Sequence, residues 1–202
     1  MMRTKKETRR QKIIETAAQI FRENGFERTS MSEIATRLGG SKGTLYSYFR
    51  SKEDLFGEVV TQRADAYMND ILSQSMDGAD VADTLRTLGE KILCVMFSSE
   101  FVTINRNVLA EAGTSDIGRV FYERGPLKVL KRLAAILESW MREGKLREAD
   151  PVVVAKQLIA LLEAEVRLPI LLGVLDVDTD VEVAPIVGRA LDVFVRAYVL
   201  PA

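Results

Sequence analysis

Small and hydrogen-bonding side chains suited to contacting nucleic acid are concentrated in one short stretch, SKGTLYSYFRSK, residues 41–52. Thr44 and Ser47 can donate or accept a hydrogen bond at a base edge, and Gly43 lets the backbone approach that edge closely. A tyrosine phenol can reach a phosphate from either flank. The residue types and their spacing therefore indicate a surface that contacts duplex DNA. The alternative is that SKGTLYSYF is an ordinary short amphipathic helix.

The helix that would carry these groups is predicted to run from Lys42 to Phe49. At 100° per residue, Leu45 and Phe49 fall on the same face and should point into a core. Gly43 then points away from that face. Because glycine inside a helix costs about 1 kcal/mol relative to alanine, its presence needs a reason, and close approach to DNA is one.

Three serines mark the starts of the helices that must position this segment. Ser30 is followed by Glu33 at the third helical position, which is a capping box. Ser41 follows two glycines, where a sharp turn is easy. Ser51 precedes acidic residues that suit the first turn of a further helix. A helix, a glycine-containing turn and a second helix make the helix-turn-helix pattern of DNA-binding proteins.

The stretch IIETAAQIFRENGFERTSMSEIATRLGGSKGTLYSYFRSKEDLFGEVV, residues 13–60, resembles the N-terminal domain of the tetracycline-repressor (TetR) family of bacterial transcription regulators. Many positions match in order over about a quarter of the chain. The resemblance implies a homodimeric, DNA-binding regulator, most simply a repressor. The residues that it implies to lie in the major groove are Lys42, Gly43, Thr44 and Ser47, and those on phosphates are Tyr46, Tyr48 and Lys52. Ser32, on the preceding helix, occupies a position that can also reach DNA.

One position departs from the family pattern. Gly40 stands where the family usually has a small apolar residue, often valine, packed between the two helices. The lost apolar burial is expected to cost about 1–2 kcal/mol and to leave the turn looser. The surface expected to contact DNA is unaffected.

The charge distribution agrees with this placement. The net charge of the chain is −1, but residues 1–52 carry 12 Lys and Arg against 5 Asp and Glu. Residues 53–202 carry the other 16 basic residues against 24 acidic ones. A local positive field supplies the salt-dependent attraction to phosphates on which DNA affinity depends. The alternative is chance clustering on a solvated face.

Composition argues against most enzyme classes and against metal or cofactor sites. The chain has no histidine and one cysteine, so neither a zinc site nor a Ser-His or Cys-His nucleophile can be built. We expect Cys94 to be a small buried hydrophobe, a redox sensor being the alternative. Neither a signal peptide nor a membrane-spanning apolar run is recognised, so a soluble cytoplasmic protein is expected.

Apolar residues recur at helical spacing along most of the chain, and no segment gives a convincing strand signal. The fold is therefore predicted to be all-α, with about nine helices. Besides a short helix after Ser30, the expected ranges are 4–24, 42–49, 52–75, 80–98, 101–112, 115–124, 127–142, 151–172 and 180–200.

Two domains are expected: a helix-turn-helix domain over 1–52 and a helical effector-binding and dimerisation domain over 53–202. The 52–75 helix would contribute to both, so a shift at its far end could tilt the DNA-binding part. The stretch RVFYERGPLKVL, residues 119–130, resembles C-terminal domains of an AefR-like branch of the TetR family.

An effector pocket is expected in the C-terminal part, as the resemblance implies, with plain core packing as the alternative for each lining residue. Its candidate residues are Met96, Phe97, Phe101, Phe121, Tyr122 and Trp140. Such walls suit a mostly apolar small molecule.

The helices over 151–172 and 180–200 are apolar on more than one face, which indicates burial in the core or contact with a partner. Two such helices from each of two chains would form a four-helix dimer interface, and a twofold dimer suits a palindromic or near-palindromic operator. Burial within one monomer is the alternative. A different class of function also stays open, namely a helical ligand-binding or adaptor protein without specific DNA binding.

Overall fold

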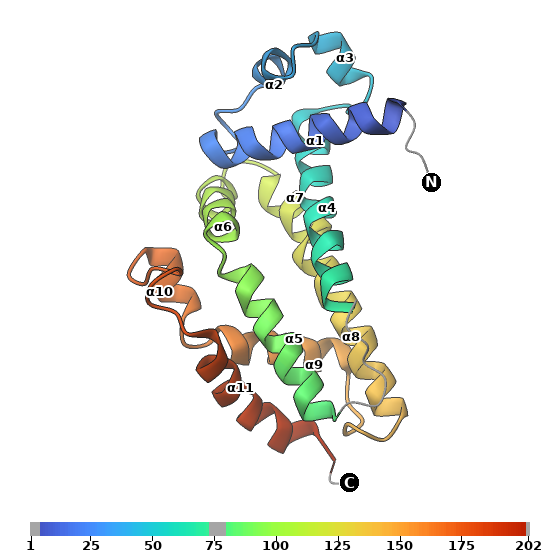
Figure 1. The fold of residues 1–202 in the computed structure, drawn as a ribbon, viewed down its shortest axis with the longest axis vertical. Coiled ribbons are helices and arrows are strands. Elements are labelled where there is room, and N and C mark those ends of the chain that lie inside the picture. Colours follow the sequence, from blue (N-terminus) through green and yellow to red (C-terminus); the bar gives the residue numbers. More distant parts are fainter. Residues whose placement is uncertain (1–4, 73–79, 201–202) are drawn as a thin grey trace. The chain divides into compact units, whose positions relative to one another are not determined.

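The computed structural model describes residues 5–72 and 80–200, and over this part of the chain the fold is all-α, as predicted (Figure 1). An isolated antiparallel bridge joins Leu146 to Val199. The described residues form eleven helices, compared with about nine predicted. They are α1 Lys5–Asn24, α2 Met31–Arg37, α3 Lys42–Tyr46, α4 Lys52–Leu72, α5 Val81–Met96, α6 Ser99–Glu111, α7 Ile117–Arg124, α8 Pro126–Arg142, α9 Pro151–Glu163, α10 Arg167–Leu172 and α11 Val183–Tyr198.

The segment predicted as one helix over 151–172 is divided into α9 and α10, so that prediction was wrong. The cause is Pro169, which lacks an N–H group and whose ring would clash with the carbonyl of Glu165 in a continuous helix. The chain instead leaves the helix after Glu163 and restarts it at Arg167, which places Pro169 in the first turn of α10, where proline is tolerated.

Of the other predicted helices, one ends earlier than expected and one has its predicted end outside the described residues. The helix expected over 42–49 ends at Tyr46, because the Ser47 hydroxyl donates to the Thr44 carbonyl at 2.7 Å and the Tyr48 amide donates to Leu45 O. A side chain that bonds the backbone in this way competes with continuation of the helix. The prediction for α4 extended to residue 75, but residues 73–75 lie outside the described part.

The chain divides into two compact units. The first contains residues 1–65 and 103–126, and the second contains 66–102 and 127–202. Both α4 and α6 contribute residues to each unit. The functional division that the sequence predicts at residue 52 stays a prediction.

The first unit is built on aromatic contacts between the end of α1, the loop after it and α4. The ring centroids of Phe21, Phe26 and Phe56 lie 5.3–5.7 Å apart, within the range of favourable aromatic pairs. The end of α7 approaches α4 so closely that a Cβ on Gly125 would lie 2.8 Å from Val60 Cγ1. This close packing of α7 on α4 requires glycine at position 125.

The second unit has a continuous apolar core in which α11 packs against α5 and α9. Leu85, Leu158 and Phe194 are each fully buried in it. Two polar links accompany this packing. Tyr198 of α11 donates from its hydroxyl to Gln157 of α9. Arg189 of α11 binds the carboxylate of Glu165, between α9 and α10, through two nitrogens at 2.6 and 2.7 Å.

Cys94 lies exposed on α5, so the prediction of a buried cysteine was wrong. The buried face of α5 carries Leu85, Leu88 and Ile92, and two residues beyond Ile92 the helix has turned by about 200°.

Among the described residues no single helix is long and apolar enough to cross a membrane, although α5 and α6 meet the length and composition requirements as a bent pair.

Candidate nucleic-acid interface

Serine caps fix the two short helices of the predicted helix-turn-helix. Ser30 Oγ accepts from the Glu33 amide and Ser41 Oγ accepts from the Thr44 amide, both at 3.1 Å. Ser51 caps α4 in the same way through the Asp54 amide. The turn between α2 and α3 contains Gly39 at a φ of +64°, a backbone conformation that favours glycine. The local signals in the sequence thus predicted where each of these helices begins.

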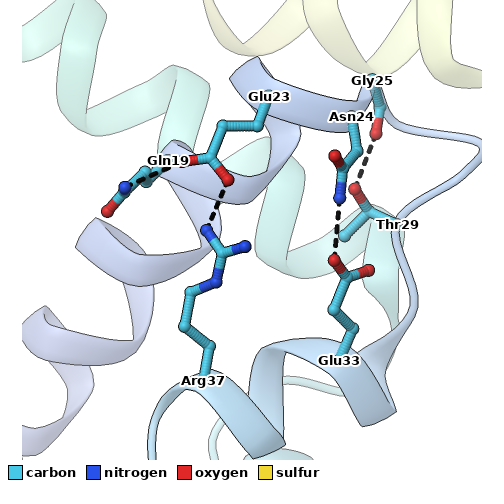
Figure 2. A network of polar contacts seen from close by, with 7 residues as sticks. All are labelled: Gln19, Glu23, Asn24, Gly25, Thr29, Glu33 and Arg37. Carbon is cyan, nitrogen blue, oxygen red and sulfur yellow. Dashed lines mark hydrogen bonds and ion pairs between the residues drawn. The ribbon is translucent and has the colours of Figure 1, made fainter.

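Polar contacts also hold α2 against α1 (Figure 2). Asn24 Nδ2 donates to Glu33 Oε1 at 2.8 Å, so the Glu33 carboxylate ties α2 to the end of α1. Glu23 accepts from Arg37 and from Gln19, as Figure 2 shows. These hydrogen bonds, chiefly that from Arg37, lower the pKa of the exposed Glu23 carboxyl.

In the segment 42–49, which consists of α3 and the three residues after it, the apolar and polar residues separate as predicted. Leu45 and Phe49 are almost fully buried, at 1% and 2% exposure. The residues predicted to contact DNA lie at the surface: Lys42, Gly43, Tyr46 and Ser47 are exposed, and Thr44 and Tyr48 are half-buried. Ser32, on α2, is also exposed.

The two hydroxyls predicted to contact bases, on Thr44 and on Ser47 at the end of α3, already have local partners. Thr44 Oγ1 lies 2.9 Å from Ser41 Oγ, and Ser47 donates to the Thr44 carbonyl. A hydroxyl oxygen that takes part in one bond can still accept another. Both groups therefore have fixed orientations and retain acceptor capacity for a base or phosphate partner.

Lys52 has a structural position that the sequence did not reveal. Its Nζ donates to the carbonyls of Phe26 at 2.8 Å and Glu27 at 3.2 Å, and lies 4.1 Å from the centre of the Phe26 ring. The ammonium group has three donors, so one remains for another acceptor. Lys52 fastens α4 to the loop that follows α1, whatever further contact it makes.

The loop after α1 is also held by α6. Glu111 Oε1 accepts from the Glu27 amide at 3.2 Å, and Glu111 Oε2 is buried with no hydrogen-bond partner within the described part of the chain. All of these groups belong to the first unit. The carboxylate at the end of α6 therefore contacts the same loop that Lys52 contacts from the start of α4.

The six predicted effector-pocket residues are divided between the two units. Phe97 and Trp140 are buried in the core of the second unit, Met96 packs against that core, and Phe101 is half-buried in the same unit. The other two belong to α7 in the first unit, where Phe121 is buried and Tyr122 is 49% exposed.

Tyr67, on α4, is a candidate that the sequence analysis missed. Its hydroxyl is buried and has no hydrogen-bond partner among the described residues. Burial, and secondarily the Cys94 thiol, raise the pKa of this phenol above its usual value. An unpaired buried hydroxyl loses its hydration without compensation, so a ligand that accepts a hydrogen bond would be stabilised there. Residue type alone gives no signal of this, because helical spacing also fits a core tyrosine.

Within residues 5–72 and 80–200, no group of three or more His, Cys, Asp or Glu side chains is arranged to hold a metal ion.

Comparison with known proteins identifies both parts of the chain. Residues 13–59 match the family model described as bacterial regulatory proteins of the tetR family. Residues 83–199 match the AefR-like transcriptional repressor C-terminal domain.

Relatives and solved structures agree with these matches. A putative TetR-family transcriptional regulator from Mesorhizobium loti superposes with a TM-score of 0.83 at 26% identity, covering 98% of this chain and 100% of the other. The flavonoid-responsive regulator FrrA superposes with a TM-score of 0.80 at 30% identity, covering 96% and 99%. The fatty acid metabolism regulator protein of Bacillus subtilis is 23% identical over 73% of this chain and 75% of its own length.

Both family models, one over the capped helix-turn-helix and one over the helices that follow it, thus agree, and the chain belongs to the TetR family of bacterial transcriptional regulators.

Proposed function

We propose that this TetR-family regulator acts in the cytoplasm as a homodimeric repressor. Each protomer places α3 in the major groove of one half of a palindromic or near-palindromic operator. A small molecule bound in the C-terminal domain releases the protein from DNA. The observation that carries the proposal is the division of the segment 42–49: Leu45 and Phe49 are buried, and the small and polar residues are exposed or half-buried.

Contact with DNA is supported by the kinds of group that α3 exposes. Lys42, expected in the major groove, also carries a charge that is attracted to the phosphates on its rim, and Tyr46 can bind a phosphate. Both contribute affinity on any sequence. Gly43, Thr44 and Ser47 are small enough for the helix to lie close to base edges, where the hydroxyls distinguish bases by donating or accepting.

Release by an effector requires that the ligand bind two conformations with different affinity. Two helices, α4 and α6, run between the units and could transmit such a difference. Lys52 at the start of α4 and Glu111 at the end of α6 both belong to the first unit, and both contact the loop after α1. A movement of either helix along its axis would therefore disturb the loop that leads into α2.

The chemistry of the effector follows from its candidate walls. Phe97 and Trp140 are apolar and aromatic, and the Tyr67 hydroxyl offers a single hydrogen bond. Aromatic walls with one polar group would suit a largely apolar molecule that carries a hydrogen-bond acceptor. The relative FrrA is described as flavonoid-responsive, and flavonoids have this combination of groups.

Dimerisation is supported by apolar side chains that the second unit leaves exposed. Leu168 and Leu172 of α10 are 66% and 69% exposed and, being four residues apart, lie on one face. Val174 and Val193 are 71% and 53% exposed. Exposed apolar groups of this size near the two C-terminal helices favour contact with a second copy.

The proposal is tested by selecting bound fragments from the source genome and measuring affinity for them by fluorescence anisotropy at several salt concentrations. We expect clear sequence preference and a steep loss of affinity with salt. Thr44→Ala should reduce the preference between selected and random duplexes, by about 1–3 kcal/mol at one base pair if the contact is direct. Indifference to every fragment at low salt would instead favour the adaptor function.

A matched pair of lysine substitutions separates phosphate contact from structural support. Lys42→Ala removes an exposed charge, so it should weaken binding to all sequences while leaving stability unchanged. Lys52→Ala leaves two carbonyls without their charged donor and should cost about 1 kcal/mol or more of unfolding free energy, measured by urea denaturation. It should also weaken binding evenly and flatten the salt dependence. Equal destabilisation by both variants, or altered sequence preference in Lys52→Ala, would contradict these roles.

Introducing charge on α10 tests the dimer. Leu168→Glu with Leu172→Glu should convert the protein to monomers in sedimentation equilibrium, because two buried carboxylates per subunit would oppose association. Operator affinity should fall in parallel. Leu109→Glu is the control, since Leu109 is 58% exposed on α6; it should leave the dimer intact. A dimer that survives both α10 changes would place the interface elsewhere.

Tyr67→Phe tests whether that hydroxyl is unpaired in the effector-free protein. The variant should be as stable as the parent or more stable by up to about 1 kcal/mol, because it removes a buried group without a partner. Tyr198→Phe is the control and should be destabilising, since the Tyr198 hydroxyl donates to Gln157. Thermal unfolding of both variants makes the comparison. Destabilisation by Tyr67→Phe as large as that by Tyr198→Phe would show that the hydroxyl has a partner.

A further inference from the structure

The side chains on the first turns of α1 line a basic hollow. Lys5, Thr8, Arg9 and Lys12 line an open hollow of about 320 Å³. Their spacing of three, four and seven residues places all four on one face of the helix. Three positive side chains and a hydroxyl around one hollow form a suitable environment for a phosphate group.

Arg9 lies at a particular place, beside the turn that leads into α3. A Cβ atom built on Gly40 would lie 2.9 Å from Arg9 Nη2, and it would meet no other heavy atom of the described residues within 4 Å outside its immediate chain neighbours. In the family pattern a small apolar residue at this position packs between the two helices. Here the space in front of the Gly40 Cα holds the Arg9 guanidinium group.

The backbone does not require glycine at this position. Gly39 has a positive φ, but Gly40 is not among the glycines that do, so a side chain at 40 would meet no backbone strain of that kind. Among the described residues, the neighbour that a Cβ atom at position 40 would displace is the Arg9 guanidinium group. The absence of a side chain at Gly40 therefore leaves the space that the Arg9 guanidinium group occupies.

Arg9 also differs from the arginine that follows it. Arg10 is paired with Glu58 at 3.0 Å and lies over the Phe49 ring. Arg9 has no carboxylate or other hydrogen-bond partner within the part of the chain that the structure describes. Its planar set of donors, which matches the oxygens of a phosphate well, therefore lies beside Gly40 and is unpaired among the described residues.

We propose that Arg9, held against Gly40 and accompanied by Lys5 and Lys12, binds a DNA backbone phosphate next to the point where α3 enters the groove, and that Gly40 is the positioning residue for Arg9. The inference rests on the proposed DNA-binding function. It adds a second anchor, from α1, that fixes the approach of α3 to the duplex and contributes to affinity on every sequence.

The test is a double-mutant cycle with Arg9→Ala, Gly40→Val and the double variant. Affinity for a selected fragment and for a random duplex is measured at several salt concentrations with the full-length protein. Arg9→Ala should lower affinity for both duplexes equally, by roughly fivefold to tenfold at 0.1 M salt, and reduce the log–log salt slope by about 1. Gly40→Val should do the same although it removes no charge.

In the double variant the two effects should not add, because valine at 40 acts only by displacing the Arg9 side chain. Arg86→Ala, an exposed charge change on α5 in the second unit, is the matched control and should leave the salt slope unchanged. Gly40→Ala provides a smaller displacement if Gly40→Val melts below the parent. The salt slope is the decisive measurement, because a purely structural role for residue 40 would not change it.

The inference is overturned if the parent protein binds DNA and both Arg9→Ala and Gly40→Val keep its affinity and slope, or if the two losses add in full. The proposed function is still supported in that case. A parent protein that binds no duplex at low salt overturns the function and the inference together, so the two failures are distinguishable.

Discussion

A five-residue helix is too short to be stable alone, so the position of α3 depends on what lies beneath it. Leu45 and Phe49 are almost fully buried, and the Arg10 guanidinium lies 5.2 Å from the centre of the Phe49 ring. Arg10 is in turn paired with Glu58 on α4. The exposed groups of α3 are therefore placed by an apolar anchor that reaches α1 and α4, and DNA recognition can be no more exact than that anchor.

The loop after α1 is held by parts of the chain that are distant in sequence. Lys52 and Glu111 hold one loop through the carbonyls of Phe26 and Glu27 and the amide of Glu27. These contacts are few and polar, in contrast to the aromatic cluster beside them. Contacts of this kind can be rearranged at modest cost, as the proposed release by an effector would require.

The sequence predicted best what local chemistry determines. Ser30, Ser41 and Ser51 each cap a helix within three residues, so their hydrogen bonds could be read from the chain. Pro169 also carried a local signal, but the continuous apolar pattern around it concealed the break. The carbonyl partners of Lys52 and the packing of Arg9 on Gly40 join segments more than 20 residues apart, and no pattern along the chain predicts such contacts.

The composition of the first unit has a consequence for modularity. Its DNA-binding part is completed by α7 and the end of α6, and the approach of Gly125 to Val60 is part of its interior. A fragment cut after α4 would expose that interior to water. A chimeric regulator that takes its whole N-terminal segment from a relative would thus keep this interior intact only if residues 103–126 came from the same relative.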